Sequence, residues 1–298
     1  MTLYFGYGSN LDARDWNAFC ERWGFVGAEL VPVSTALMLD CELAFDRYAA
    51  SRRGGALNLR DRPGQAVEGV VFRANRAALY ALDRKEGAPA HYQRLDRHVV
   101  LPDGHVLPVM TYAGPSQGYH APHADYVGVV RRGQAAHGIA HDMMEAVARD
   151  AAPSLTIRHL FVYGTLMQGE ANAHHLEGIA RAPGRVAGLL HDCGAYPALS
   201  LGPGEVHGEV VELPLTRLAG MDALEDAAPG GAPGGMYRRS VLRVLTAAGV
   251  IRAYAYVMDE AARFPVISGG DWRSVGKRHA AWAAYAARSG KDERTGGA

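Results

Sequence analysis

Two glutamates stand at matching places in the two halves of this 298-residue chain. Glu86 follows Asp83 by three residues, and Glu225 follows Asp222 by three. Each pair closes an apolar helical pattern, so its two carboxylates share one side of the expected helix. A neighbouring negative charge and partial burial would both raise the pKa of the glutamate, which suits a group that accepts and returns a proton near neutrality. The alternative is a solvated pair of carboxylates at a helix end.

A Tyr-Gly turn comes early in each half. Residues 3–11 are LYFGYGSNL and residues 160–170 are LFVYGTLMQGE. In both, a strand-like run enters a glycine turn and then a helix-like segment, so backbone N–H groups can converge on an anion and the helix dipole adds to the attraction. The alternative is an ordinary strand-to-helix turn. Leu11 stands where a dinucleotide fingerprint needs its third glycine, and neither copy is a GxxxxGK loop, which disfavours nucleotide binding.

Other polar residues carry weaker signals. Neither His120 with His123 nor the His174-His175 pair has a third ligand at a suitable spacing, so we expect no metal site. The three cysteines are scattered and show no CxxC spacing, as expected of core thiols in a reducing compartment. Three tyrosines are candidate hydroxyl donors in a cleft or half-buried packing residues: Tyr92, Tyr126 and Tyr237.

The elements around these residues occur twice in the same order. A strand with a Val-x-Gly motif is followed by an amphipathic helix, a Tyr-containing segment (HYQR or MYRR) and a hairpin pattern. Asp-Gly at residues 103–104 is placed for a tight hairpin turn. The strands cover residues 66–74 and 205–213, and the helices cover residues 78–88 and 217–227. Single helices between hairpins predict two α+β domains, each built on a curved mixed sheet.

Composition excludes several classes of protein. Thirty-one basic and thirty-one acidic residues leave no formal charge, so neither nucleic acid nor an anionic membrane surface is the expected partner. No apolar stretch approaches the roughly 18 residues of a membrane span, and we expect a cytoplasmic protein. Pro153 would end the preceding helix and places a linker near residues 150–159. We therefore expect domains at residues 1–152 and 157–288, and a disordered tail at 289–298.

Taken together, the motifs resemble a known family. YFGYGSNL, LAFDR, GGALNLR, VEGVVF, LDRKEG and DYVGVVRRGQAAHGI make the first half similar to the γ-glutamyl cyclotransferases. FVYGTLMQGEANAHHL, YPAL, VHGEVVEL, MDALE, YRR and SGGDW make the second half similar to the related γ-glutamylamine cyclotransferase and AIG2-like branch. The resemblance implies two small mixed β-barrels flanked by helices, and an enzyme that needs no cofactor.

It also implies a reaction on a small γ-glutamyl substrate. The substrate's α-amine attacks its own γ-carbonyl, closing 5-oxoproline and releasing an amine or amino acid, with Glu86 or Glu225 as the proton shuttle. Backbone N–H groups of the two turns would hold the substrate carboxylate or the oxyanion, and tyrosines would line the pocket. The implied binding residues are Tyr7, Gly8, Ser9, Asn10, Leu11, Tyr92 and Tyr126 in the first domain, and Tyr163, Gly164, Thr165, Leu166 and Tyr237 in the second.

The second domain departs from the pattern, because Tyr237 follows Glu225 by twelve positions whereas Tyr92 follows Glu86 by six. The Gly- and Pro-rich insertion is either a flexible lid or a decayed edge. Two other functions stay open: an amide hydrolase or transferase that forms no 5-oxoproline, and a binding module without turnover. The leaving group and the oligomeric state also stay open.

Overall fold

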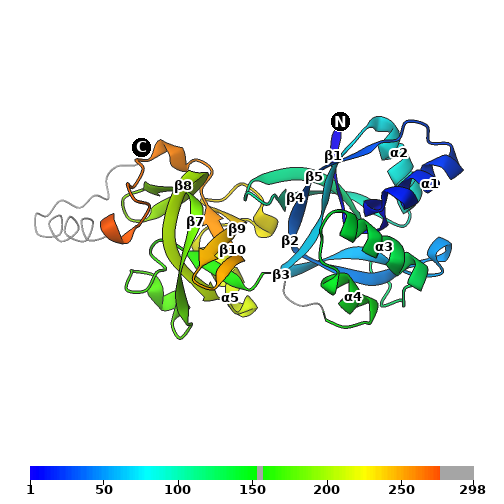
Figure 1. The fold of residues 1–298 in the computed structure, drawn as a ribbon. Helices are drawn as coiled ribbons and strands as arrows, with labels where there is room; N and C mark the ends of the chain where they lie inside the picture. The colour runs from blue at the N-terminus through cyan, green and yellow to red at the C-terminus, as the bar shows by residue number, and fades with distance from the viewer. Residues whose placement is uncertain (153–156, 276–298) are drawn as a thin grey trace, which may run out of the picture.

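The computed structural model describes residues 1–152 and 157–275, and its chain forms two lobes that lie side by side (Figure 1). Each lobe contains a closed five-stranded barrel. The strands of the first barrel are β1 (Thr2–Gly6), β2 (Leu30–Ala49), β3 (Gly54–Ala74), β4 (Gln93–Val100) and β5 (Val106–Ala113). Those of the second are β6 (His159–Val162), β7 (Arg181–Asp192), β8 (Pro197–Glu212), β9 (Arg238–Thr246) and β10 (Gly249–Val257).

The two barrels have the same topology, which confirms the internal repeat. Going round the first barrel the order is β1-β3-β2-β4-β5, and the second has β6-β8-β7-β9-β10. In each, the short first strand pairs antiparallel with the third strand and parallel with the fifth, so both sheets are mixed. The expected α+β class, with two tandem barrels flanked by helices, is confirmed.

The glycine of the repeated Val-x-Gly motif has a structural reason. A Cβ atom at Gly69 would lie 2.4 Å from the carbonyl oxygen of Gly6, and one at Gly208 would lie 2.2 Å from that of Val162. No side chain fits at either distance. Each glycine therefore lets the third strand of its barrel approach the strand that leads into the Tyr-Gly turn.

The helices of the first domain are α1 (Ala13–Trp23), α2 (Arg76–Glu86), α3 (Ala124–Ala136) and α4 (Asp142–Ala148), and that of the second is α5 (Leu215–Leu224). The side chain of Asn75 caps α2 by accepting from the N–H of Ala78, and Gly87, with φ 63°, ends it. Helix α2 therefore stops at Glu86, directly beside the barrel mouth. Helices α1 and α2 lie at the end of the first lobe that is remote from the second (Figure 1).

One expectation about the repeat was wrong. The first Tyr-Gly turn leads through a short 3-10 turn (Ser9–Leu11) into α1, but the second leads into turns and a 3-10 segment (Ala173–Leu176). Asn172 folds this segment back, since its side-chain amide donates to the Thr165 hydroxyl at 3.0 Å and its backbone N–H donates to the Thr165 carbonyl at 2.8 Å. The second turn therefore has no helix dipole behind it.

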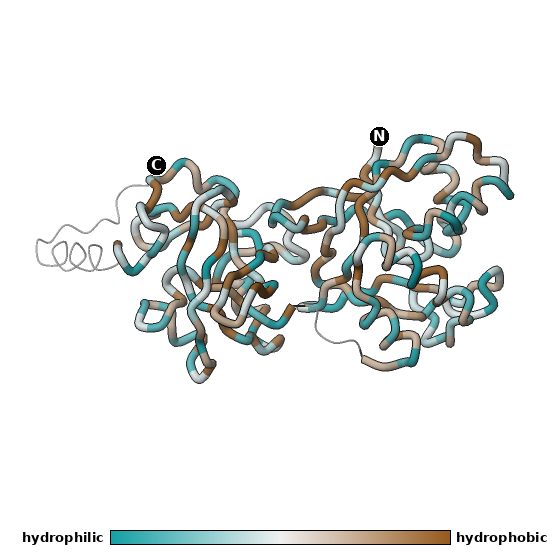
Figure 2. Tube along the Cα trace, viewed as in Figure 1, coloured by the Kyte–Doolittle hydropathy of each residue, from teal (hydrophilic) through white to brown (hydrophobic). Residues whose placement is uncertain are grey.

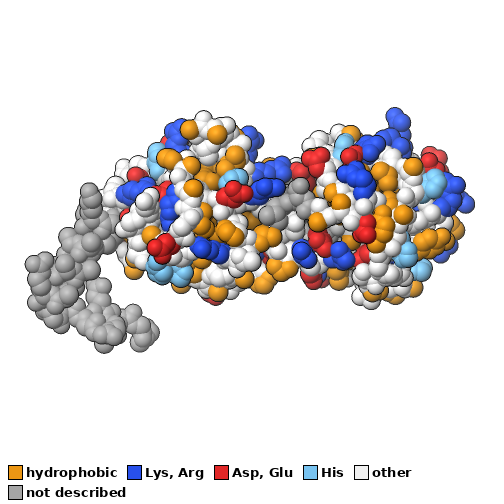
Figure 3. Space-filling model, turned by 90° about the horizontal axis from the view of Figure 1, so that it is seen from below, with side chains coloured by type: hydrophobic (Ala, Val, Ile, Leu, Met, Phe, Trp, Pro, Cys, Tyr) orange, Lys and Arg blue, Asp and Glu red, His pale blue; other side chains and the backbone are white. Residues whose placement is uncertain are grey.

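Buried apolar side chains form the cores of both barrels, and one of these cores includes residues of both domains. Figure 2 shows where hydrophobic residues lie along the chain. Leu37, Leu39 and Val100 of the first domain pack within the core of the second. Basic and acidic side chains are interspersed over the face in Figure 3, as expected from the balanced composition. Within the described ranges, no helix is long and apolar enough to cross a membrane. Parts of the predicted linker, residues 153–156, and the whole predicted tail lie outside the described residues.

Candidate active sites

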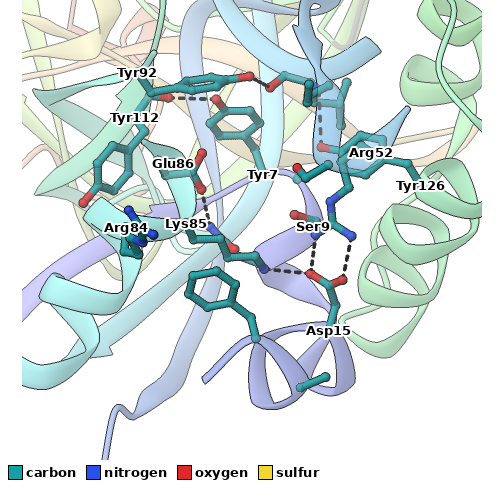
Figure 4. Close-up of a pocket in the computed structure, with 18 of the residues that line it drawn as sticks. Tyr7, Ser9, Asp15, Arg52, Arg84, Lys85, Glu86, Tyr92, Tyr112 and Tyr126 are labelled. Carbon is teal, nitrogen blue, oxygen red and sulfur yellow. Dashed lines mark hydrogen bonds and ion pairs between the residues drawn. The ribbon is translucent and has the colours of Figure 1, made fainter. Parts of the chain in front are cut away.

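The first domain has a cavity of about 510 Å³ at its barrel mouth, between α1, α2, α3 and the first Tyr-Gly turn (Figure 4). Seven of the eight residues predicted for this site line the cavity: Tyr7, Gly8, Ser9, Asn10, Glu86, Tyr92 and Tyr126. The eighth, Leu11, does not. Its side chain is buried in the core and its N–H donates to the carbonyl of Gly8 at 3.1 Å, so the N–H is used inside the turn.

Glu86 is held in place by the turn. Asn10 is buried and its side-chain amide donates to Glu86 Oε1 and to the Tyr4 hydroxyl, each at 2.8 Å. Burial raises the pKa of Glu86, although Lys85, the Asn10 hydrogen bond and Arg52 oppose the shift. The turn and the end of α2 thus place a half-buried carboxyl group with a raised pKa inside the cavity, as a proton shuttle requires.

The predicted influence of Asp83 on Glu86 was wrong. Asp83 accepts from Arg94 at 2.7 and 2.8 Å and from the Tyr112 hydroxyl at 2.7 Å. These contacts neutralise its charge. Burial, and not a like charge, raises the pKa of Glu86.

Three tyrosine hydroxyls bond the backbone around the cavity. Tyr7 donates to the carbonyl of Tyr112 at 2.7 Å, and Tyr92 donates to the carbonyl of Leu57 at 2.8 Å. The Tyr126 hydroxyl, on α3, accepts from the N–H of Leu57 at 3.3 Å. Burial raises the pKa of all three hydroxyls, so they stay protonated at neutral pH. They form a rigid, neutral wall.

Sequence reasoning missed a charged cluster in the lining of the cavity. Asp15 accepts from both terminal nitrogens of Arg52, at 2.8 and 2.7 Å, and from Lys85 Nζ at 2.7 Å (Figure 4). Two cations share one carboxylate, which leaves one positive charge beside Glu86. Lys85 directly precedes Glu86, so the sequence could have pointed to it. No motif or spacing links Arg52 to Lys85 or to Glu86. Further out, Arg84 stacks on Trp23, with Cζ 4.4 Å from the ring centroid.

The second domain has a smaller cavity, of about 240 Å³, at the matching barrel mouth. All six residues predicted for this site line it: Tyr163, Gly164, Thr165, Leu166, Glu225 and Tyr237. Glu225 directly follows α5, and burial alone raises its pKa to about 7. As in the first domain, the neighbouring Asp222 contributes nothing to this shift, because Arg239 and the Tyr256 hydroxyl pair with it.

The tyrosine bonds repeat those of the first site. Tyr163 donates to the carbonyl of Tyr256 at 2.7 Å, and Tyr237 donates to that of Pro197 at 2.8 Å. Two differences stand out. Leu166 takes the place of Asn10, so no side-chain amide reaches the glutamate, and the described residues that line the second cavity include no Lys or Arg.

The insertion after Glu225 is not a free lid. Gly230 N–H donates to Asp40 of the first domain at 2.7 Å, and Gly231 is buried, where a Cβ atom would lie 3.2 Å from Leu39. At its far end, Met236 N–H donates to Asp226 and closes the loop on itself. The loop therefore docks the second domain on the first.

The histidines considered as metal ligands do not assemble a site. Among the described residues, no three His, Cys, Asp or Glu side chains are grouped so as to hold a metal ion. His174 and His175 stack on each other, with ring centroids 4.2 Å apart. His123 caps α3 by accepting from the N–H of Asp125.

Comparisons with known proteins fit this geometry. The family model "Gamma-glutamyl cyclotransferase, AIG2-like" matches twice, at residues 4–134 and 160–274. A putative gamma-glutamylcyclotransferase of Vibrio cholerae is 36% identical over 121 residues, 39% of this chain and 96% of that protein. The gamma-glutamylcyclotransferase of Bos taurus is 28% identical over 142 residues, 46% of this chain and 72% of that protein.

Solved structures match at lower identity. A gamma-glutamyl cyclotransferase superposes with a TM-score of 0.44 at 22% identity, covering 51% of this chain and 89% of its own. YkqA from Bacillus subtilis covers 94% of this chain and 97% of its own, with a TM-score of 0.34 at 12% identity. Because the family model covers both barrels and both glutamate-bearing cavities, the chain belongs to the gamma-glutamyl cyclotransferase, AIG2-like family, with two copies of the family's domain in tandem.

Proposed function

We propose that the chain is a γ-glutamyl cyclotransferase with two active sites, one in each barrel. The observation that carries the proposal is the pairing, in both domains, of a half-buried glutamate with a Tyr-Gly turn across one cavity. A binding module needs the turn but has no use for a carboxyl group whose pKa burial has raised. Both domains have such a group, Glu86 and Glu225, in the lining of the cavity.

The reaction needs one group that both accepts and returns a proton. The ionised glutamate accepts a proton from the substrate's α-ammonium group, and the freed amine attacks the γ-carbonyl carbon. The bond to the leaving nitrogen then breaks as the glutamic acid returns the proton to that nitrogen. The ring nitrogen loses its second proton, which the released amine takes up, so the products are 5-oxoproline and an amine in its ammonium form. Because the nucleophile is tethered to the carbonyl, holding the cyclising conformer supplies much of the rate enhancement. N–H groups of Gly8, Ser9 and Asn10, or of Gly164, Thr165 and Leu166, would hold the substrate's anionic oxygens.

The two cavities differ in charge where the leaving group would lie. The first is lined by Arg22, Arg52, Arg84 and Lys85, with Asp15 as partial compensation. The second has no cationic lining residue among those described. Cations attract a leaving group that carries a carboxylate, and a cavity whose described lining has no cation tolerates a leaving amine without one. This difference supports γ-glutamyl amino acids or peptides as substrates of the first site and γ-glutamyl amines as substrates of the second.

The nature of the product tests the proposal. Purified protein is incubated with γ-glutamyl amino acids, a γ-glutamyl peptide and γ-glutamyl alkylamines, and both 5-oxoproline and glutamate are quantified. The proposal expects 5-oxoproline in amounts equal to the released amine. Glutamate in its place would show a hydrolase, a new γ-glutamyl amide would show a transferase, and binding without any product would show a non-catalytic module.

A further inference from the structure

Both carboxylate oxygens of Asp40, a residue of the first domain, accept hydrogen bonds. One accepts from a donor in the first domain, and the other accepts from donors in the second. Asp40 sits at a bulge in β2, between Leu39 and Cys41, with φ 58°. Oδ1 accepts from the N–H of Gly64 in its own barrel at 2.9 Å. Oδ2 accepts from the Arg239 guanidinium and from the N–H of Gly230 at 2.7 Å, both in the second domain. A positive φ is uncommon for a residue other than glycine, and here it turns a carboxylate across the seam.

Arg239 receives this carboxylate in a closed environment. Its side chain is only 1% exposed, and its guanidinium lies 4.8 Å from the Tyr254 ring centroid. Its Nε lies 3.0 Å from Asp222 on α5. One buried cation is thus neutralised from two sides, by Asp222 within the second domain and by Asp40 from the first. Removing one partner of a buried charge is costly because the remaining charge stays desolvated.

The contacts of Asp40 and Arg239 connect to the second cavity in two ways. Asp222 lies one helical turn before Glu225, and it accepts from the Tyr256 hydroxyl at 2.8 Å. The carbonyl of Tyr256 in turn accepts from Tyr163 of the Tyr-Gly turn. The second route is the loop after Glu225, which Asp40 holds at Gly230.

The first domain contains the same trio without an external partner. Asp83, Arg94 and Tyr112 match Asp222, Arg239 and Tyr256, although Arg94 donates two hydrogen bonds to Asp83 whereas Arg239 and Asp222 form an ion pair through Nε. The side chains of Asp83 and Arg94 are 33% and 43% exposed, so solvent stabilises them. In the second domain the equivalent Arg is buried, and Asp40 takes the place of solvent. The second site therefore uses a residue from the first domain, whereas no such contribution is recorded in the opposite direction among the described contacts.

We propose that Asp40 is a positioning residue for the second active site: through Arg239 and Gly230 it fixes the end of α5 and the loop beyond it, so that Glu225 points at the substrate only when the first domain is docked. The inference rests on the proposed function of the second domain. It makes the first barrel both an enzyme in its own right and a structural part of its neighbour's active site.

The test uses full-length protein in which Glu86→Gln silences the first site. Asp40→Asn suits the purpose because Asn tolerates positive φ and keeps the size of Asp, but it carries no charge and has one accepting oxygen where Asp40 serves three donors with two. The control is Glu68→Gln, which breaks a different ion pair across the seam, Glu68 to Arg252 at 2.9 Å, outside this network. In an otherwise wild-type second domain, Asp40→Asn is expected to lower kcat on γ-glutamyl amines about tenfold or more with little change in KM, as expected of a misplaced catalytic group. Glu68→Gln is expected to leave both unchanged.

Two further measurements separate positioning from a loss of folding. Calorimetric titration with 5-oxoproline counts the folded sites of both domains, and Asp40→Asn is expected to keep the binding stoichiometry of its Glu86→Gln parent. Hydrogen–deuterium exchange of residues 222–236 is expected to rise in Asp40→Asn and not in Glu68→Gln. Unchanged exchange, an unchanged kcat in an active second site, or a kcat loss matched by lost stoichiometry would each overturn the proposal. If Glu86→Gln alone abolishes all turnover, the proposed activity of the second domain is wrong. Hydrogen–deuterium exchange of residues 222–236 then decides whether Asp40 anchors the loop.

Discussion

In the proposed reaction, the carboxyl group that shuttles the proton is shielded from water yet open to the substrate. The two glutamates proposed for this role are held differently. Glu86 accepts from Asn10 and lies near two cations that partly offset its burial. Glu225 has no such support, and burial alone raises its pKa to about 7. The two sites should therefore respond differently to pH and to changes in the surrounding residues.

Asn10→Leu should shift the pH profile of the first site. The change copies Leu166 of the second domain and removes a hydrogen bond that lowers the pKa of Glu86. The base must be ionised to accept the substrate's proton, so a higher pKa moves the acid limb of kcat/KM to higher pH. The measurement is the pH profile of 5-oxoproline release in a Glu225→Gln background. An acid limb that stays in place would show that Glu86 is not the titrating base.

Glu225→Gln should stabilise the protein above pH 7. The pKa of Glu225 rises from 4.5 to about 7 on folding, so the unfolded chain loses its proton first and stability falls as pH rises from 4.5 to 7. Glutamine does not titrate. The variant should gain at most about 3 kcal/mol at pH 8 and nothing near pH 4. Denaturant unfolding at the two pH values measures this, and an equal effect at both would show that burial does not perturb Glu225.

Gly8→Val should block the first turn without disturbing the fold. A Cβ atom at Gly8 would lie 3.7 Å from the Tyr126 hydroxyl, which is ordinary contact, so the added methyl groups would project into the cavity. Gly164 offers no matched test, because a Cβ there would lie 2.6 Å from Pro197 and strain the turn itself. Thermal stabilisation of the first domain by 5-oxoproline should vanish in Gly8→Val. Persistent stabilisation would place the anion site elsewhere.

At the scale of elements, α1 and α2 set the character of the first cavity. They bring Asp15, Arg22 and Trp23 from one helix and Arg84 and Lys85 from the other to its rim. The second domain has a 3-10 segment where α1 would follow the turn, and its cavity is smaller and without cations among the described lining residues. The missing helix is thus a physical reason for the proposed difference in substrates.

Arg84→Gln should weaken only substrates whose leaving group is anionic. Arg84 is exposed and stacks on Trp23, where it can meet a carboxylate at the cavity rim. We expect KM for a γ-glutamyl amino acid to rise about twofold to fivefold, the range of an exposed ion pair, with kcat unchanged. A γ-glutamyl alkylamine serves as the control substrate. Equal effects on both would show that Arg84 does not contact the leaving group.

Local patterns predicted the repeated elements well. The strand-turn motifs, the Val-x-Gly strands and the helices that end near Glu86 and Glu225 all depend on short-range periodicity and on glycine, which a single sequence displays. Asp15, Arg52 and Arg239 were not predicted as parts of these networks, because each acquires its partner through tertiary packing between segments far apart in the chain. The predicted effect of the Asp83 charge on the pKa of Glu86 was wrong for the same reason, because Arg94 and Tyr112 neutralise that charge.

At the scale of the whole molecule, two copies of one domain have become unequal partners. The first carries the larger, cationic cavity. The second carries a smaller one with no cation among its described lining residues, and the ion pairs beside it reach across to Asp40 of the first domain. Leu37 and Leu39 of the first barrel also join the apolar core of the second. Docking of this kind gives tandem copies a way to diverge in substrate while remaining one folded unit.

The measurement that tests the central claim most directly is 5-oxoproline release by four full-length proteins on one panel of substrates: wild type, Glu86→Gln, Glu225→Gln and the double variant. Each single variant should keep its fold and lose about 100-fold or more on one group of substrates, because glutamine preserves shape but cannot carry the proton. The expected losses are on γ-glutamyl amino acids or peptides for Glu86→Gln and on γ-glutamyl amines for Glu225→Gln, with the double variant inactive on both. Identical profiles for the two single variants would contradict the division of labour, and turnover that survives in the folded double variant would contradict the assignment of both glutamates.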